Sequence, residues 1–108
     1  MDLQLPPILT EYIRASNAHE VEAILACFSE AATVRDENET LHGKAAIRGW
    51  IAKTITRYSF RFDPLSLHQD EDETILSMSV SGTFPGSPVT LDFQFRTEGG
   101  KIASLSID

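Results

Sequence analysis

The sequence predicts an α+β fold in which three N-terminal helices pack in a curved antiparallel sheet. Residues 6–28 carry apolar side chains at helical spacing, and a third apolar stripe of the same spacing follows Gly43. From Tyr58 onward the apolar period changes to two, which indicates strands joined by short turns. A chain of 108 residues can bury one hydrophobic core but not two, so we expect a single domain over residues 1–108.

The first two helices are expected on either side of Asn17. Pro6 and Pro7 suit the first positions of a helix, where the missing amide donor costs little, and the apolar stripe that follows includes Tyr12. A second stripe from Val21 places Phe28 on its apolar face. The short connection between the two stripes predicts an antiparallel pair of helices.

Residues 31–50 join this helical part to the rest of the chain. Alternation over residues 32–36 places Asp36 on the same side as Ala32 and Val34, the side that should be buried. A buried carboxylate is costly unless it is hydrogen-bonded, exposed at a strand end, or facing a cavity that uses its shifted pKa. A polar turn is expected at residues 36–40, and the inward stripe of the third helix includes Trp50.

Four strands are expected after Tyr58. Phe60 and Phe62 alternate, and Pro64 then shifts the phase, which we interpret as a bulge or bend in one long strand. The charge run at residues 69–73 is typical of a solvated turn. The next strands are expected at residues 74–84 and 89–96, the first of them with Met78 and Phe84 on its apolar side, and a last strand follows the glycine pair at residues 99–100.

Helices on one face of a curved sheet tend to leave a conical pocket, which is a common site for small molecules. The aromatic and apolar residues expected to wall it are Phe28, Trp50, Phe60, Phe62, Met78 and Phe84, and His68 could point into it as an alternative base. The opposite face would carry a serine run and the row Thr90, Asp92, Gln94 and Arg96. Such a row predicts either solvent or a polar homodimer interface.

Composition narrows the functional classes. Nine Lys and Arg against sixteen Asp and Glu give a net charge of −7, which argues against nucleic acid and anionic membranes as partners and favours a neutral or weakly charged small molecule. The partner that we expect is a small apolar or carbonyl-containing molecule. The lone Cys27 excludes an internal disulfide, and three histidines in unrelated contexts argue against a metal site. We expect no cofactor. The N-terminus lacks signal-peptide features and the apolar runs are short, so a cytoplasmic protein is expected.

Three segments resemble the nuclear transport factor 2-like superfamily, whose fold is a cone-shaped or cystatin-like roll. They are residues 12–18 (YIRASNA), residues 28–36 (FSEAATVRD) and residues 42–50 (HGKAAIRGW). Within that superfamily the chain is similar to ketosteroid isomerases and to polyketide-cyclase proteins of the SnoaL-like kind. The scaffold hosts isomerases, dehydratases, cyclases, epoxide hydrolases and non-catalytic binding domains, so the resemblance implies the fold more specifically than the substrate. It also implies a homodimer.

The resemblance assigns roles to three residues. In ketosteroid isomerases a helix tyrosine and a protonated aspartic acid on a late strand donate hydrogen bonds to a dienolate oxygen, while an aspartate after the first strand moves the proton. Tyr12 matches the tyrosine, Asp36 the proton-transferring base, and Asp92 the second acid. Alternation, however, places Asp92 beside Gln94 and Arg96 on the polar side, in which case Leu91 takes the pocket position.

Two functions follow from these residues. The first is an isomerase or lyase that transfers a proton next to a carbonyl, with Asp36 as acid/base, Tyr12 as donor to the enolate oxygen and Asp92 as a further donor if it points inward. The second is a ligand-binding or dimerisation module with the same pocket and no turnover. Asp36 could also be a solvated turn residue, and Tyr12 a core residue.

Overall fold

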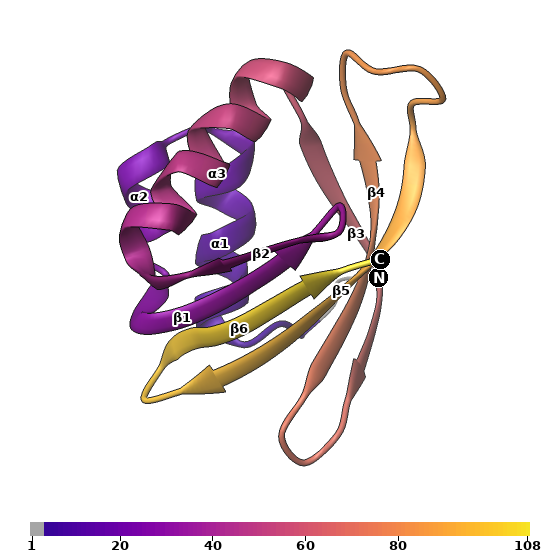
Figure 1. Ribbon diagram of the computed structural model, residues 1–108. Coiled ribbons are helices and arrows are strands. Elements are labelled where there is room, and N and C mark those ends of the chain that lie inside the picture. The colour runs from indigo at the N-terminus through magenta and orange to yellow at the C-terminus, as the bar shows by residue number, and fades with distance from the viewer. Residues whose placement is uncertain (1–3) are drawn as a thin grey trace.

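The computed structural model describes residues 4–108 and confirms the α+β class. Residues 1–3, which belong to the expected domain and N-terminal stretch, lie outside the described range. The elements, in chain order, are α1 (Pro7–Asn17), α2 (Val21–Leu25), β1 (Phe28–Asp36), β2 (Glu39–His42), α3 (Gly43–Tyr58), β3 (Arg61–Gln69), β4 (Thr74–Ser81), β5 (Val89–Glu98) and β6 (Lys101–Ile107). The three helices gather on one face of the curved sheet (Figure 1).

The six strands form one sheet in the order β2-β1-β6-β5-β4-β3. Most neighbours are antiparallel, but β1 runs parallel to β6. The expectation of a purely antiparallel sheet was therefore wrong, because the chain crosses the sheet between β1 and β6 instead of returning by a hairpin. The helices also do not all precede the strands, since β1 and β2 lie between α2 and α3.

The β1–β2 hairpin explains where Asp36 lies. Glu37 and Asn38 both have positive φ, 50° and 64°, as a two-residue hairpin turn requires. Asp36 pairs with Glu39 across this turn, so its carboxyl group sits at the tip of the hairpin. The polar turn was expected from the sequence, but β2 was not, because none of its four residues is fully buried.

A bulge in β3 and the turn between β5 and β6 lie where the sequence predicted them. The register between β3 and β4 shifts between Pro64 and Ser66, which confirms the bulge predicted at the proline. Gly99 and Gly100 have φ of 57° and 78° and join β5 to β6, which confirms the predicted hairpin. These glycines adopt a conformation that other residues reach only with strain.

The end of α1 is fastened to β3 by two side chains. The Asn17 amide donates to the Phe62 carbonyl at 3.0 Å and accepts from the Phe62 amide at 2.7 Å, as a neighbouring strand would. A ring nitrogen of His19 lies 2.7 Å from the Phe60 carbonyl. These contacts hold the last turn of α1, and therefore its inward residues, against the first half of β3.

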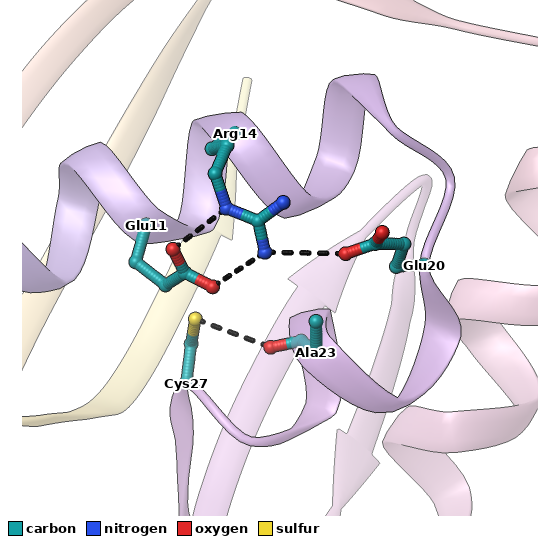
Figure 2. A network of polar contacts seen from close by, with 5 residues as sticks. All are labelled: Glu11, Arg14, Glu20, Ala23 and Cys27. Carbon is teal, nitrogen blue, oxygen red and sulfur yellow. Dashed lines mark hydrogen bonds and ion pairs between the residues drawn. The ribbon is translucent and has the colours of Figure 1, made fainter.

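An exposed polar network connects α1 to α2 (Figure 2). Arg14 donates to Glu11 at 2.8 and 2.7 Å and to Glu20 at 3.1 Å. Below this network, and separate from it, the buried Cys27 thiol donates to the Ala23 carbonyl at 3.5 Å. Because about half of the Arg14 side chain is exposed, water screens these ion pairs and they add little to the stability of the helix pair. The network therefore orients the helices, and burial of their apolar faces stabilises them.

The inner face of the sheet meets the helices in one apolar core. Leu9, Ala15, Ile47, Phe95 and Ile102 are essentially inaccessible to solvent. The outer face carries Ser77, Asp92, Gln94 and Arg96, which agrees with the alternation of the sequence. Within residues 4–108 no helix has both the length and the apolarity to cross a membrane.

Candidate functional site

A cavity of about 390 Å³ lies between the helices and the inner face of the sheet. Its walls are mainly aromatic and aliphatic, and the aromatic side chains include Trp50, Tyr58, Phe60, Phe62, Phe84 and Phe93. Such a cavity, apolar with few polar groups, is the usual form of a small-molecule site.

Asp36 lies at the border of this cavity. It also borders a polar groove formed by residues 35–40 and the end of β6, so the carboxyl group separates the apolar interior from solvent. The Trp50 indole Nε1 donates to Asp36 Oδ2 at 3.0 Å. Partial burial raises the pKa of Asp36 above its ordinary 3.8, and the Trp50 hydrogen bond acts in the opposite direction. The side chain therefore combines a raised pKa with a fixed orientation.

Tyr12 enters the same cavity from α1. Its ring is 2% exposed and packs edge-on against Phe28 and Phe95 and stacks on Phe62, with centroid distances of 6.0, 5.5 and 6.2 Å. Burial, and then the negative charge of Asp36, raise the pKa of the Tyr12 phenol. The hydroxyl thus stays protonated at neutral pH. Because the charge of Asp36 acts on it, the two groups share one electrostatic environment.

Two further hydroxyl groups line the cavity, and the sequence analysis did not single them out. Ser16 follows Tyr12 by one helical turn and is 1% exposed, and its Oγ has no hydrogen-bond partner among the described residues. It lies near enough to lower the pKa of the Tyr12 phenol, although no hydrogen bond of good geometry joins the two. The Thr54 hydroxyl, by contrast, donates to the Ile51 carbonyl at 3.0 Å. Nothing in the sequence around a helical serine indicates that its hydroxyl is buried without a hydrogen-bond partner.

The end of α3 and the loop between β4 and β5 form another part of the cavity wall. The Tyr58 hydroxyl donates to Glu37 Oε1 at 2.7 Å, and the Tyr58 ring meets Phe84 edge-on at 5.8 Å. The Thr83 amide donates to the Tyr58 carbonyl at 2.7 Å. At Gly82 any Cβ would lie 2.3 Å from that same carbonyl, so only glycine lets this loop dock on the helix.

Of the six residues predicted to wall the pocket, Trp50, Phe60, Phe62 and Phe84 line the cavity. Phe28 and Met78 do not line it. They are 1% and 0% exposed and belong to the core around it. Sequence alternation identifies the inner face of a strand, but it does not distinguish the residues that reach the cavity from those packed behind them.

His68 and Asp92 lie away from the cavity, which corrects the expectation for His68 and the role that the resemblance assigned to Asp92, and confirms the outward position that alternation predicted for Asp92. His68 is exposed on β3, where its Nε2 is 3.6 Å from Asp70 Oδ1. Asp92 is exposed on the outer face of β5 and accepts a hydrogen bond from Ser77 Oγ at 2.6 Å. Leu91 takes the inward position beside it, as the alternation of the strand requires.

The charged groups of the cavity lining are all acidic. Asp36, Glu37 and Asp108 contribute carboxyl groups, and no Lys, Arg or His lines the cavity within residues 4–108. No cluster of three or more His, Cys, Asp or Glu in that range has the arrangement of a metal site. The chemistry that these side chains can perform is proton transfer by Asp36 and hydrogen bonding by Tyr12 and Ser16.

Comparison with known proteins adds a family and several structures. The family described as a SnoaL-like domain matches residues 9–105. A solved structure of SMa1630 from Sinorhizobium meliloti, a candidate polyketide cyclase, is 36% identical, with a TM-score of 0.93 over 96% of this chain and 95% of that chain. No curated protein matches the sequence.

Two other structures resemble this chain at lower identity. SalBIII, an epoxide hydrolase/cyclase-like enzyme of pyran ring formation in the polyether salinomycin, is 27% identical, with a TM-score of 0.79 over 93% of this chain and 85% of that chain. A Catenulispora acidiphila protein with a ketosteroid isomerase-like fold, solved with trimethylamine, is 21% identical, with a TM-score of 0.85 over 97% and 86% of the two chains. At that identity the likeness shows the fold alone.

Proposed function

Since this chain belongs to the SnoaL-like domain family, we propose that it binds a neutral carbonyl compound in its cavity and moves a proton next to the carbonyl, as an isomerase, lyase or cyclase. The observation that carries this proposal is the pairing of Asp36 with Tyr12. A half-buried carboxyl group with a raised pKa and a buried, protonated phenol line the same apolar cavity. Neither metal nor cofactor is needed for this chemistry.

In the proposed reaction the Asp36 carboxylate accepts a proton from the carbon next to the carbonyl. The electron pair of the broken C–H bond moves into a new C=C bond, and the carbonyl oxygen becomes an enolate. A base works best when its pKa lies near the working pH, and burial shifts Asp36 in that direction. The protonated Asp36 then returns its proton to another carbon, which completes an isomerisation. Attack of the enolate on an electrophile within the same substrate would instead close a ring.

Tyr12 would stabilise the enolate oxygen in this scheme. Its raised pKa keeps the proton on the phenol, so the group acts as a hydrogen-bond donor throughout. A fixed donor in a dry site is effective because no water must reorganise when charge develops, and the loss of one such donor typically lowers kcat by about 10²–10³.

The second candidate function is binding without turnover. It is favoured by Leu91, which puts an apolar side chain where the resemblance to ketosteroid isomerases would put a second acid. A cavity with one fewer strong donor would bind the same class of molecule and accelerate its reaction less.

Isomerisation of cyclohex-3-en-1-one to the conjugated enone, followed by ultraviolet absorption, separates the two functions. The wild type should accelerate the reaction, with a rate that rises with pH through the pKa of Asp36, and Asp36→Asn should abolish the acceleration. Asp92→Asn is the matched control, because it makes the same change on the outer face. Equal rates for the wild type and Asp36→Asn would remove Asp36 as the base. Ketone binding without acceleration would support the binding function.

The proposal extends to a homodimer through the outer face of the sheet. Ile75 lies there in a polar row, paired with His68 of β3 and Gln94 of β5. An apolar residue in such a row is typical of the centre of a polar interface. Light scattering should give twice the chain mass of 12.0 kDa for the wild type and the single-chain mass for Ile75→Asp. A wild-type mass of 12.0 kDa at micromolar concentration would contradict the dimer.

A further inference from the structure

The hydrogen-bond donors of the cavity differ in whether they are already used. Five neutral side-chain donors line it among the described residues, namely Tyr12, Ser16, Trp50, Thr54 and Tyr58. Three of them donate to protein groups, Trp50 to Asp36, Thr54 to the Ile51 carbonyl and Tyr58 to Glu37. The hydroxyls of Tyr12 and Ser16 donate to no other protein group within residues 4–108, and their only polar neighbour there is each other. These two are therefore the donors that remain for a ligand.

The two unused donors are neighbours. Residues four apart on a helix lie on the same face, so Tyr12 and Ser16 present their hydroxyls from successive turns of α1. The contacts of Asn17 and His19 with β3 hold this part of α1 in place. The two hydroxyls are therefore held in place on the side of the cavity that α1 forms.

Ser16 is the unusual member of the pair. A helical serine commonly satisfies its hydroxyl at the carbonyl four residues earlier, and a buried hydroxyl without any partner destabilises the fold. Ser16 is 1% exposed and its Oγ is unpaired, yet the residue lines a cavity. A ligand oxygen would supply the missing partner.

The opposite wall offers no equivalent group. The inward residues of β5 are Val89, Leu91 and Phe93, all apolar, and Asp92 faces the other way. Since the donors of Trp50, Thr54 and Tyr58 are already used, a ligand oxygen that accepts a hydrogen bond in the cavity would turn toward α1.

We propose that Ser16 is the second hydrogen-bond donor to the substrate oxygen, beside Tyr12. This inference rests on the proposed function and makes it more specific. The substrate would be a neutral molecule whose carbonyl oxygen faces α1 and whose apolar body lies against Leu91 and the aromatic walls.

Binding of 2-naphthol and naphthalene tests the inference without requiring turnover. The two probes have the same fused rings, and only 2-naphthol carries an oxygen, which models the enol. Fluorescence titration of the wild type should show tighter binding of 2-naphthol. Ser16→Ala should reduce that preference about two- to tenfold, the range expected for one neutral hydrogen bond, and should leave the affinity for naphthalene unchanged. Ser16→Ala should also raise the Tm, because it removes an unpaired buried hydroxyl.

Thr54→Val is the matched control. It removes a hydroxyl from the same cavity, but one that is already bonded to the Ile51 carbonyl. Both affinities should shift together in this variant, so the preference for 2-naphthol should stay at the wild-type ratio.

Each other outcome counts against the inference. The role of Ser16 would be overturned if Ser16→Ala kept the preference for 2-naphthol, or if Thr54→Val lost as much of that preference. A lower Tm of Ser16→Ala would also overturn it, because the hydroxyl would then be satisfied within the fold. Cyclohex-3-en-1-one isomerisation that persists in those cases would leave the proposed function standing. A wild type that binds neither probe would overturn both.

Discussion

The Trp50 indole donates a hydrogen bond to the Asp36 carboxyl group at 3.0 Å and so joins the middle of α3 to the tip of the β1–β2 hairpin. The contact stabilises the carboxylate form, whereas burial favours the neutral acid. Burial and the Trp50 hydrogen bond are therefore the two largest and opposing influences on the pKa of Asp36, with smaller ones from Glu37 and Glu39, and the hydrogen bond can be removed by itself.

Removing the indole N–H should raise the pKa of Asp36 further. In Trp50→Phe the ring is kept but the donor is lost, so the carboxylate would form only at higher pH. If Asp36 is the base, the acid limb of the pH–rate profile should move to higher pH. Ser77→Ala is the control, since it removes a donor from the carboxyl group of Asp92 on the outer face, and its acid limb should not move. An unmoved limb in Trp50→Phe would show that the indole does not tune the base.

The raised pKa of Asp36 also predicts how stability depends on pH. A carboxyl group whose pKa is higher in the folded state stabilises the fold most below its unfolded pKa of about 3.9, and this contribution is lost as pH rises through the folded pKa. Asp36→Asn should therefore be more stable than the wild type at neutral pH, and the difference should vanish near pH 3. Urea unfolding across this range measures it, with Asp92→Asn as the control for removing one charge. A difference that is constant with pH would contradict the raised pKa.

A negative charge on the ligand should weaken its binding, because every ionisable group in the described cavity lining is acidic or a phenol. The carboxylate of 2-naphthoate would lie near Asp36, Glu37 or Asp108 without a cation to balance it. We expect it to bind at least about tenfold more weakly than 2-naphthol at neutral pH. Fluorescence titration of both probes checks this, and equal affinities would indicate a cationic group within reach of the ligand.

Docking of the 82–88 loop should depend on Gly82. A Cβ at this position would lie 2.3 Å from the Tyr58 carbonyl and 3.1 Å from the Phe84 ring, so Gly82→Ala should destabilise the fold by about 1–3 kcal/mol and open the cavity at Phe84. Gly49→Ala is the matched control, because nothing lies within 4 Å of its added Cβ in the exposed face of α3. That change should stabilise by up to about 1 kcal/mol in urea unfolding. Equal effects of the two substitutions would mean that the loop is not docked.

Much of this architecture could be predicted from periodicity. The change from helical to alternating spacing predicted the last four strands, and Pro64 and the glycine pair at 99–100 marked irregular points that the register confirms. The parallel pairing of β1 with β6 could not be predicted, because the strands are distant in the chain and local spacing says nothing of partners. The four-residue β2 was missed since its pattern is polar.

The apolar walls of the site were largely predictable from spacing, but a polar site residue could be recognised from its spacing only where it breaks a local rule. Asp36 on the buried side of a strand is such a residue, and the structure places it beside the cavity. The position of His68 and the importance of Ser16 could not be predicted from the sequence. His68 follows a bulge that changes which way its side chain faces, and the importance of Ser16 lies in a hydrogen bond that it does not make.

The alternation of Leu91 and Asp92 along β5 restricts how this scaffold can acquire a stronger acid in its interior. Sliding the strand by one residue would turn the carboxyl group inward, but it would also turn Phe93 and Phe95 out of the core. An insertion or deletion in a flanking hairpin therefore cannot bring an acid from β5 into the cavity without disrupting the core. A point substitution of Leu91 by an acidic residue could do so.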